Sequence, residues 1–228
     1  MLARMSASVR STRVEGGATR PLGKILCVGR NYGDHAREMG VALPEEPFFF
    51  LKPATSFRDA PSSIALPSFS RAVHYEVEMV VRVGVFLRNA TLAEADRSVD
   101  AVAVGLDLTA RDVQAQAKGA GLPWTLAKGF DGAAPIGPFV AVGAASDCAD
   151  LGLRLEVNDV IRQHARTSAM VHGVPALLAF LAARMTLEPG DLLFTGTPAG
   201  VGPLAPGDHL LASLSGAPSL ECRVVADG

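Results

Sequence analysis

The sequence VHYEVEMVVRVGV, residues 73–85, alternates polar and apolar residues over its first half. Successive side chains of a β-strand point to opposite faces, so a strand here places His74, Glu76 and Glu78 on one face and the apolar residues between them on the other. The simplest interpretation is an ordinary strand with a solvent-exposed polar face. The alternative is that the two glutamates line a site.

A second stretch, AVAVGLDL at residues 101–108, favours the site. Its apolar run is typical of a strand that is buried on both faces, and Asp107 follows that run directly. A carboxylate buried there needs a cation, hydrogen-bond donors or a raised pKa, and no Lys or Arg lies along the run to neutralise it. The alternative role for Asp107 is to cap the next helix, but Thr109, with Asp112 three residues later, is better placed as the cap.

Three carboxylates that meet at one point form a hard, oxygen-rich metal site. Such a site suits Mg²⁺, with Mn²⁺ or Ca²⁺ as alternatives, and it does not suit a structural zinc. The sequence therefore predicts metal ligands at Glu76, Glu78 and Asp107, on condition that the two stretches lie side by side.

The remaining pattern predicts an α+β fold, with a mixed, mostly antiparallel sheet system and a few helices. We expect one domain over residues 24–228 and an N-terminal extension over residues 1–23. The other expected helices run from Asn31 or Asp34 to about Met39, over 92–100, and from near Pro175. The other expected strands are at 25–28, 192–195, 209–214 and 220–225, with strand and loop over 44–67 and a hairpin of 151–157 and 160–164 around Asn158-Asp159.

Composition excludes several classes of protein. The 228 residues are 49% hydrophobic and 19% charged, with a formal net charge of −2, so the chain is globular and has no strongly basic field for nucleic acid. The longest apolar stretch, 171–187, is interrupted by Pro175 and Arg184, which argues against a membrane span. We expect no nucleic-acid partner and no membrane association.

The cysteines and the N-terminus bear on the compartment. Cys27, Cys148 and Cys222 are odd in number and widely spaced, which indicates a reduced, cytoplasmic protein. Residues 1–20 contain four arginines, several serines and one acid, a composition similar to that of a transit peptide. We interpret them as a polar extension and predict a cytoplasmic location.

Six motifs in order resemble the fumarylacetoacetate hydrolase family, in particular its short acylpyruvate hydrolase and oxaloacetate decarboxylase group. The motifs are VGRNYGDHAREM (28–39), FLKP (50–53), HYEVE (74–78), LDLTARDVQ (106–114), LPWTLAK (122–128) and TGTPAGVGP (195–203). The resemblance implies a mixed β-roll, a homodimer and a small 2-oxo acid as substrate.

The resemblance also implies a role for each matching residue. Glu76, Glu78 and Asp107 match the family's metal ligands, and Lys128 matches a lysine that contacts the substrate oxygen. His35 and Glu38 match a catalytic pair on a mobile lid helix. The polar residues that match the lining of the site are Arg111, Gln114 and Thr197.

The local pattern is compatible with this chemistry. His35 and Glu38 are three positions apart and share one face of a helix, so Glu38 can orient His35 as a general base; the alternative is a surface pair worth a few tenths of a kcal/mol. We expect a Mg²⁺-dependent hydrolase that cleaves a C–C bond of acylpyruvates such as fumarylpyruvate through a pyruvate enolate. The alternatives are an oxaloacetate decarboxylase, an isomerase of unsaturated 2-oxo dioic acids, and a metal-stabilised binding protein without turnover.

Overall fold

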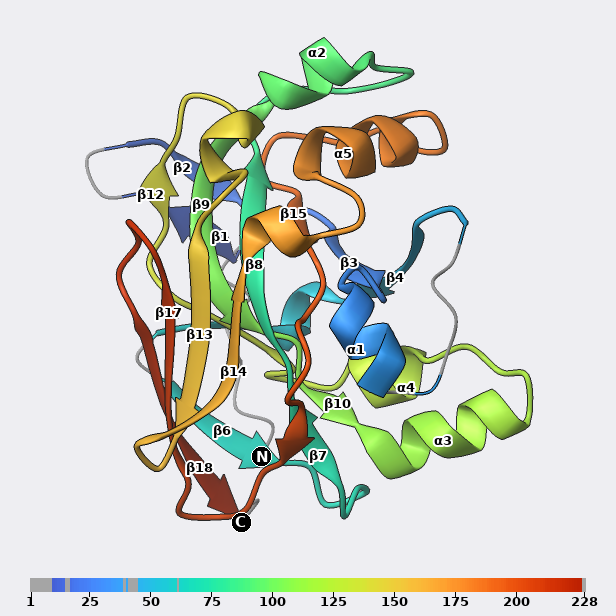
Figure 1. Cartoon of the computed structure of the whole chain (residues 1–228), viewed down its shortest axis with the longest axis vertical. Coiled ribbons are helices and arrows are strands. Elements are labelled where there is room, and N and C mark those ends of the chain that lie inside the picture. Colours follow the sequence, from blue (N-terminus) through green and yellow to red (C-terminus); the bar gives the residue numbers. More distant parts are fainter. Residues whose placement is uncertain (1–9, 15–16, 39, 41–44, 61, 227–228) are drawn as a thin grey trace, which may run out of the picture.

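The protein is built around two packed sheets (Figure 1). The computed structural model describes residues 10–14, 17–38, 40, 45–60 and 62–226 of the chain. The larger sheet has eight strands. Seven follow the order β4 (Phe48–Lys52), β3 (Ile25–Gly29), β15 (Leu192–Phe194), β8 (Val77–Val83), β9 (Val99–Leu106), β11 (Ala134–Ile136), β5 (Phe57–Asp59), and the eighth, β12 (Val140–Ala141), pairs with β9. The smaller sheet has five, in the order β14 (Val160–Arg166), β13 (Gly152–Val157), β17 (His209–Leu214), β18 (Leu220–Ala226), β6 (Ser62–Leu66).

Two short sheets and five α-helices complete the described fold. One short sheet has three strands, in the order β10 (Thr109–Ala110), β7 (Val73–Tyr75), β16 (Gly202–Pro203). The other is a hairpin of β1 (Ser11–Arg13) and β2 (Thr19–Pro21). The helices are α1 (Gly33–Glu38), α2 (Leu92–Asp96), α3 (Arg111–Gly119), α4 (Thr125–Lys128), α5 (Val174–Ala182), with 3-10 turns η1 (Ala54–Ser56), η2 (Ala145–Cys148), η3 (Thr167–Ala169). Most strand pairs are antiparallel, but β3–β15, β5–β11 and β6–β18 are parallel. The predicted mixed α+β fold is confirmed.

The centre of the molecule is the antiparallel pair β8 and β9, and every residue of β8 is buried. One face of the pair packs with β13 and β17 in the larger hydrophobic cluster, to which β8 contributes Val77, Met79 and Val81. The other face contributes Val80 and the alanines at 101 and 103 to a second cluster. Burial on both faces is what the apolar run at 101–108 predicted.

Most of the expected elements are present. The hairpin of β13 and β14 turns at Asn158-Asp159, both with positive φ, as a two-residue turn requires. Helix α5 has its proline in the first turn, as expected from Pro175. The expected helix ending at Met39 and the start of the 44–67 segment fall partly outside the described residues.

One helix boundary and one helix cap were predicted wrongly. The helix expected over 92–100 ends at Asp96, because Arg97 and Ser98 form a turn and the buried strand β9 begins at Val99. Thr109 does not cap a helix: it lies in β10, and α3 begins two residues later without a side-chain cap. The Thr109 hydroxyl donates instead to Glu76, and Asp112 accepts from Ser70.

The N-terminal hairpin β1–β2 is attached to the larger sheet by Arg82 of β8. This arginine is 1% exposed and donates to Asp100 at 2.7 Å, and to the carbonyl oxygens of Thr12 and Ala18 at 3.2 and 3.1 Å. The hairpin residue Arg20 also pairs with Asp100 at 2.8 Å. Residue 24 as a domain boundary stays a prediction.

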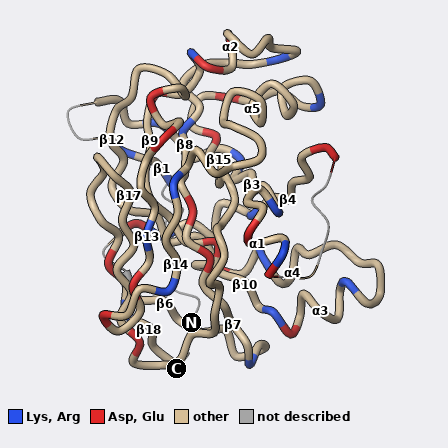
Figure 2. Tube along the Cα trace, viewed as in Figure 1, with Lys and Arg blue, Asp and Glu red and all other residues tan. Residues whose placement is uncertain are grey.

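Charged residues of both signs are interspersed along the trace (Figure 2), and the three cysteines form no disulfide. Within the described part of the chain, no helix is long and apolar enough to cross a membrane.

Replacing Arg82 with Met should lower the free energy of unfolding by about 2–3 kcal/mol, because the guanidinium hydrogen bonds to the Thr12 and Ala18 carbonyl oxygens and to the Asp100 carboxylate are lost. Urea unfolding measures the change. The matched control is Arg184→Met, since Arg184 pairs with Glu46 at the surface and should change stability by less than about 0.5 kcal/mol. Equal losses in the two variants would contradict the anchoring role of Arg82.

Candidate active site

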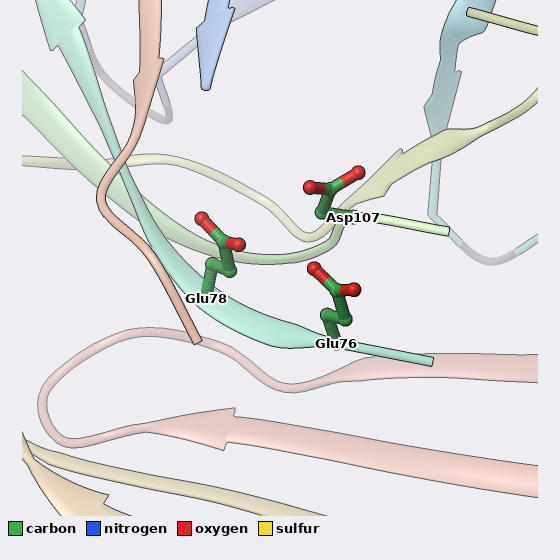
Figure 3. A group of neighbouring side chains, drawn as sticks. All are labelled: Glu76, Glu78 and Asp107. Carbon is green, nitrogen blue, oxygen red and sulfur yellow. The ribbon is translucent and has the colours of Figure 1, made fainter. Parts of the chain in front are cut away.

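The three predicted metal ligands lie together where β8 and β9 adjoin (Figure 3). Glu78 is in β8, Glu76 immediately precedes β8, and Asp107 immediately follows β9. The register pairs Val77 with Leu106, and the Asp107 N–H donates to the Glu76 carbonyl oxygen at 2.8 Å. The antiparallel pairing of β8 with β9 therefore brings the two sequence stretches side by side.

The predicted alternation does not extend to His74. The strand expected over 73–85 is interrupted at Glu76, and His74 belongs to β7 in the three-stranded sheet, where it is paired with Thr109. The interruption lets Glu76 turn toward Asp107 while Glu78 keeps its place in β8.

One oxygen from each of the three carboxylates lies within 4.8 Å of the other two. Ligand distances of about 2.0–2.6 Å allow two oxygens bound to one Mg²⁺ or Ca²⁺ to lie up to about 4–5 Å apart, so this separation fits a shared cation. Glu76, Glu78 and Asp107 are 5%, 1% and 1% exposed. The predicted ligand set thus has the geometry of a hard-metal site.

Three basic side chains surround two of these carboxylates. Lys128 donates to Glu76 at 2.9 Å and to Asp107 at 2.6 Å, and Arg111 pairs with Glu76. Lys52, which is 3% exposed, lies 2.8 Å from Asp107 and donates to the carbonyl oxygens of residues 108 and 128. The three acids and three bases are formally balanced.

The pKa values follow from this arrangement. Burial opposes the charge of Glu76, but Lys128 and Arg111 outweigh it and lower the pKa of Glu76 to about 2. Burial, with the neighbouring charges of Asp107 and Glu76, raises the pKa of Glu78 well above its usual value. Burial also opposes the charge of Lys128, but Asp107 and Glu76 raise the pKa of its ammonium group.

Glu78 is the group that lacks a cation. It accepts a hydrogen bond from the Gly196 N–H at 2.7 Å, and none of the described Lys, Arg or His side chains forms an ion pair with it. A divalent cation held by the three carboxylates supplies the positive charge that Glu78 lacks, so the residues fit a metal.

His35 lies beside this cluster and Glu38 lies behind His35. His35 is 7% exposed and lines the same cavity as the three carboxylates. Its Nδ1 is 3.3 Å from the Glu38 carboxylate, which also accepts the Gly200 N–H at 3.1 Å. Glu38 therefore links α1 to the 195–203 loop and holds the ring of His35 in one orientation.

The other predicted residues line the cavity too. Arg111 donates to Gln114 at 2.9 Å, and the Thr197 hydroxyl donates to the Val77 carbonyl oxygen at 2.9 Å. Each predicted site residue except Glu38 is in the lining. The residues that line the cavity are Val28, Gly29, Arg30, His35, Phe48, Phe50, Glu76, Glu78, Asp107, Arg111, Gln114, Lys118, Trp124, Lys128, Thr197.

Sequence reasoning missed two buried residues of the site. Lys52 ends the apolar run FFFLK, and a lysine at the end of such a run was the available signal. Gln163 accepts from the Val77 N–H at 2.9 Å and donates to Thr197 at 2.8 Å, so it fixes both the glutamate strand and the 195–203 loop. No local pattern distinguishes Gln163 from its exposed neighbours in β14.

The three histidines without a predicted role lie elsewhere. His164 is exposed, and His209 pairs with Glu221 at 2.8 Å at the surface. The backbone of His172 is bound on both sides by the side chain of Asn31, which makes it part of the support of the 29–31 segment.

Comparison with known proteins places these features in a family. The model of the fumarylacetoacetate (FAA) hydrolase C-terminal family matches residues 24–225. A mitochondrial oxaloacetate tautomerase of Bos taurus is 42% identical over 91% of this chain and 97% of its own. The structure of fumarylpyruvate hydrolase from Pseudomonas aeruginosa in complex with Mn²⁺ and pyruvate is similar with a TM-score of 0.92 and 35% identity, over 99% of this chain and 100% of that one.

A third similar structure carries a different reaction name. It is a 5-carboxymethyl-2-hydroxymuconate delta-isomerase from Mycobacterium smegmatis, with a TM-score of 0.80 and 37% identity, over 93% of this chain and 86% of that one. The relatives thus share a fold and differ in their named reactions.

Replacing Glu78 with Gln should have opposite effects with and without metal. In EDTA the variant should melt at the same temperature as the wild type or higher, because Gln removes a charge that burial and two acids disfavour. With Mn²⁺ at 100 times the wild-type Kd, the wild type should gain about 2.7 kcal/mol of stability and the variant much less. Thermal melts with and without Mn²⁺ measure both effects.

The control for this pair of melts is Glu46→Gln, an exposed glutamate outside the cavity. It should keep the full Mn²⁺ effect. A Glu78→Gln protein that gains as much from Mn²⁺ as the wild type does would show that Glu78 is not a ligand.

Proposed function

Because the chain belongs to the fumarylacetoacetate hydrolase family, we propose that it is a divalent-metal-dependent enzyme that forms an enolate from small 2-oxo acids. The observation that carries the proposal is one cavity lined both by three buried carboxylates and by His35. Mg²⁺ is the cation we propose, with Mn²⁺ or Ca²⁺ as alternatives, since each prefers oxygen ligands.

When bound by Glu76, Glu78 and Asp107, a divalent cation supplies a Lewis acid for the charge that develops on the substrate's 2-oxo group. The chain itself provides cationic donors beside that position. Lys128 and Arg111 both line the cavity and both contact Glu76, so their remaining donors are available to an anionic substrate. They stabilise negative charge as fixed positive charges placed beside the position where it develops.

His35 is the residue that moves a proton. Its ring is buried at the cavity wall and Glu38 fixes its Nδ1, which leaves Nε2 as the nitrogen that exchanges a proton with the substrate or with water. Because Glu38 lies outside the cavity lining, we assign it a positioning role.

The first candidate reaction is the keto–enol tautomerisation of oxaloacetate. It requires removal of a proton from C3 and protonation of the 2-oxo oxygen, and a single base beside fixed positive charges is sufficient for it. The relative named an oxaloacetate tautomerase, 42% identical over nearly the full length of both chains, supports this candidate.

The second candidate is hydrolysis of acylpyruvates such as fumarylpyruvate. His35 takes a proton from water, the water oxygen adds to the C4 carbonyl carbon, and the C3–C4 bond breaks to leave a pyruvate enolate that is protonated at C3. The similarity to fumarylpyruvate hydrolase from Pseudomonas aeruginosa supports this candidate. Decarboxylation of oxaloacetate would use the same enolate, and isomerisation of an unsaturated 2-oxo dioic acid, supported by the Mycobacterium smegmatis structure, would use the same proton transfer.

We also propose that the protein is a homodimer. Strand β4 is at the edge of the larger sheet, and its neighbourhood exposes an apolar surface in which Leu51 and Leu122 are 46% and 61% exposed. A strand edge with exposed apolar side chains favours pairing with a second copy of the chain.

Replacing His35 with Ala should lower kcat/KM for oxaloacetate tautomerisation and for acylpyruvate hydrolysis by about 10²–10⁴-fold, because both lose their base. Removing the metal with EDTA should abolish both reactions. The two rates are measured by ultraviolet absorbance at matched Mg²⁺, and the ratio of the wild-type rates decides which reaction is the main one.

His209→Ala serves as the matched control, since His209 pairs with a glutamate as His35 does but lies at the surface. It should retain wild-type rates. Metal-independent turnover, or full activity of His35→Ala, would contradict the proposed function.

A further inference from the structure

Two cations of the cavity take no part in the charge balance of the carboxylate cluster. Lys52, Lys128 and Arg111 are each in direct contact with a carboxylate of the cluster. Arg30 and Lys118 line the same cavity, and in the described part of the chain neither forms an ion pair with a carboxylate. The rim of the cavity therefore has positive charge that the protein leaves uncompensated.

Both cations lie over one pair of aromatic rings. The guanidinium carbon of Arg30 is 5.5 Å from the centre of the Phe48 ring, and Lys118 Nζ is 4.9 Å from the centre of the Trp124 ring. The two rings contact edge to face, with centres 5.4 Å apart. The aromatic pair thus holds the two cations on one side of the cavity, and it does so without neutralising them.

Lys118 lies in a positive field. Burial lowers the pKa of its ammonium group, and the nearby charges of Arg111 and Arg30 lower the pKa further. An anion between these groups relieves their mutual repulsion, whereas an apolar ligand does not.

The backbone holds Arg30 in a conformation that few side chains adopt. Its φ is +57°, and the other described non-glycine residues with positive φ are Asn or Asp. A side chain at Gly29 would meet the Phe48 ring at 2.1 Å, so glycine there lets the ring lie against the chain. Asn31 binds the backbone of His172 and Thr195, which fixes the segment on its other side. Non-glycine residues in strained conformations are concentrated at functional sites.

We propose that Arg30 and Lys118 bind the second carboxylate of a dianionic 2-oxo acid. The carboxylate cluster would take the 2-oxo acid end, and the two rim cations would take the distal end. The protein would then prefer 2-oxo dicarboxylic acids over monocarboxylic acids of equal length. This inference rests on the proposed function, because it assumes that the 2-oxo end binds at the metal.

The charges are consistent with this assignment. The six side chains of the cluster sum to zero, and one divalent cation brings the cluster to +2, to which Arg30 and Lys118 add positive charge at the rim. A monoanion neutralises half of the metal's charge, whereas a dianion neutralises it and also reaches the rim. Charge-assisted hydrogen bonds from Arg and Lys to a carboxylate are among the stronger polar contacts in proteins.

The test uses two probes of equal length, 2-oxoglutarate and 2-oxopentanoate, which differ in a distal carboxylate or methyl group. Their Kd values for the Mn²⁺-loaded protein are measured by calorimetry. The wild type should bind the diacid at least about tenfold more tightly. Lys118→Met should reduce that ratio by about threefold or more and leave the Kd of 2-oxopentanoate within about twofold, and Lys118→Arg should restore the ratio.

Arg30→Asn is the second variant, because Asn tolerates the left-handed backbone, and it should also reduce the ratio. Arg184→Met is the matched control: Arg184 lies over the Phe180 ring, outside the cavity, and should leave both Kd values unchanged. Equal affinity of the wild type for the two probes, or a ratio unchanged in both cavity variants, would overturn the inference and leave the proposed function standing. If neither probe binds when Mn²⁺ is present, the proposed function fails and the inference fails with it.

Discussion

Three carboxylates lie within 4.8 Å of one another in a buried site, and the surrounding elements supply the groups that stabilise them. A buried carboxylate without a partner is expensive, and like charges add to the cost. Lys52, Lys128 and Arg111 offset it for Glu76 and Asp107, while Glu78 is left with one backbone N–H. A divalent cation held by the three carboxylates would give Glu78 the positive partner that it lacks, so binding of such a cation should stabilise this region of the fold.

The architecture serves to place these charges. Strands β8 and β9 are buried on both faces and pair so that the residues at their adjoining ends converge. Side chains from the surrounding elements then complete the site: Lys128 from α4, Lys52 from β4, and His35 from α1. Gln163 of the smaller sheet fixes the strand and the Thr197 loop on the opposite side, so both sheets support one cavity.

The parts of this arrangement that the sequence predicted are those with a local periodic signal. Burial of 101–108 and the position of Asp107 at the strand end follow from the apolar run, and the hairpin at Asn158-Asp159 follows from its turn residues. Convergence of Asp107 with the two glutamates depends on strand register, which alternation along one strand does not encode. The ion pairs of Asp107 were missed for the same reason: Lys52 and Lys128 come from β4 and α4, and no spacing within one element links them to it. Two further features depend on tertiary contacts. The strand is interrupted at Glu76, and the Thr109 hydroxyl donates to the Glu76 carboxylate instead of capping a helix.

We propose above all that Glu76, Glu78 and Asp107 together hold one divalent cation to which a 2-oxo acid binds. The most direct measurement is a crystal structure of the protein with Mn²⁺ and oxalate, with anomalous diffraction used to locate the manganese. We expect one strong peak, about 2.0–2.6 Å from an oxygen of each of the three carboxylates, with the oxalate bound to the same ion. A peak that is absent from this cluster, or that contacts only one of the three carboxylates, would contradict this proposal.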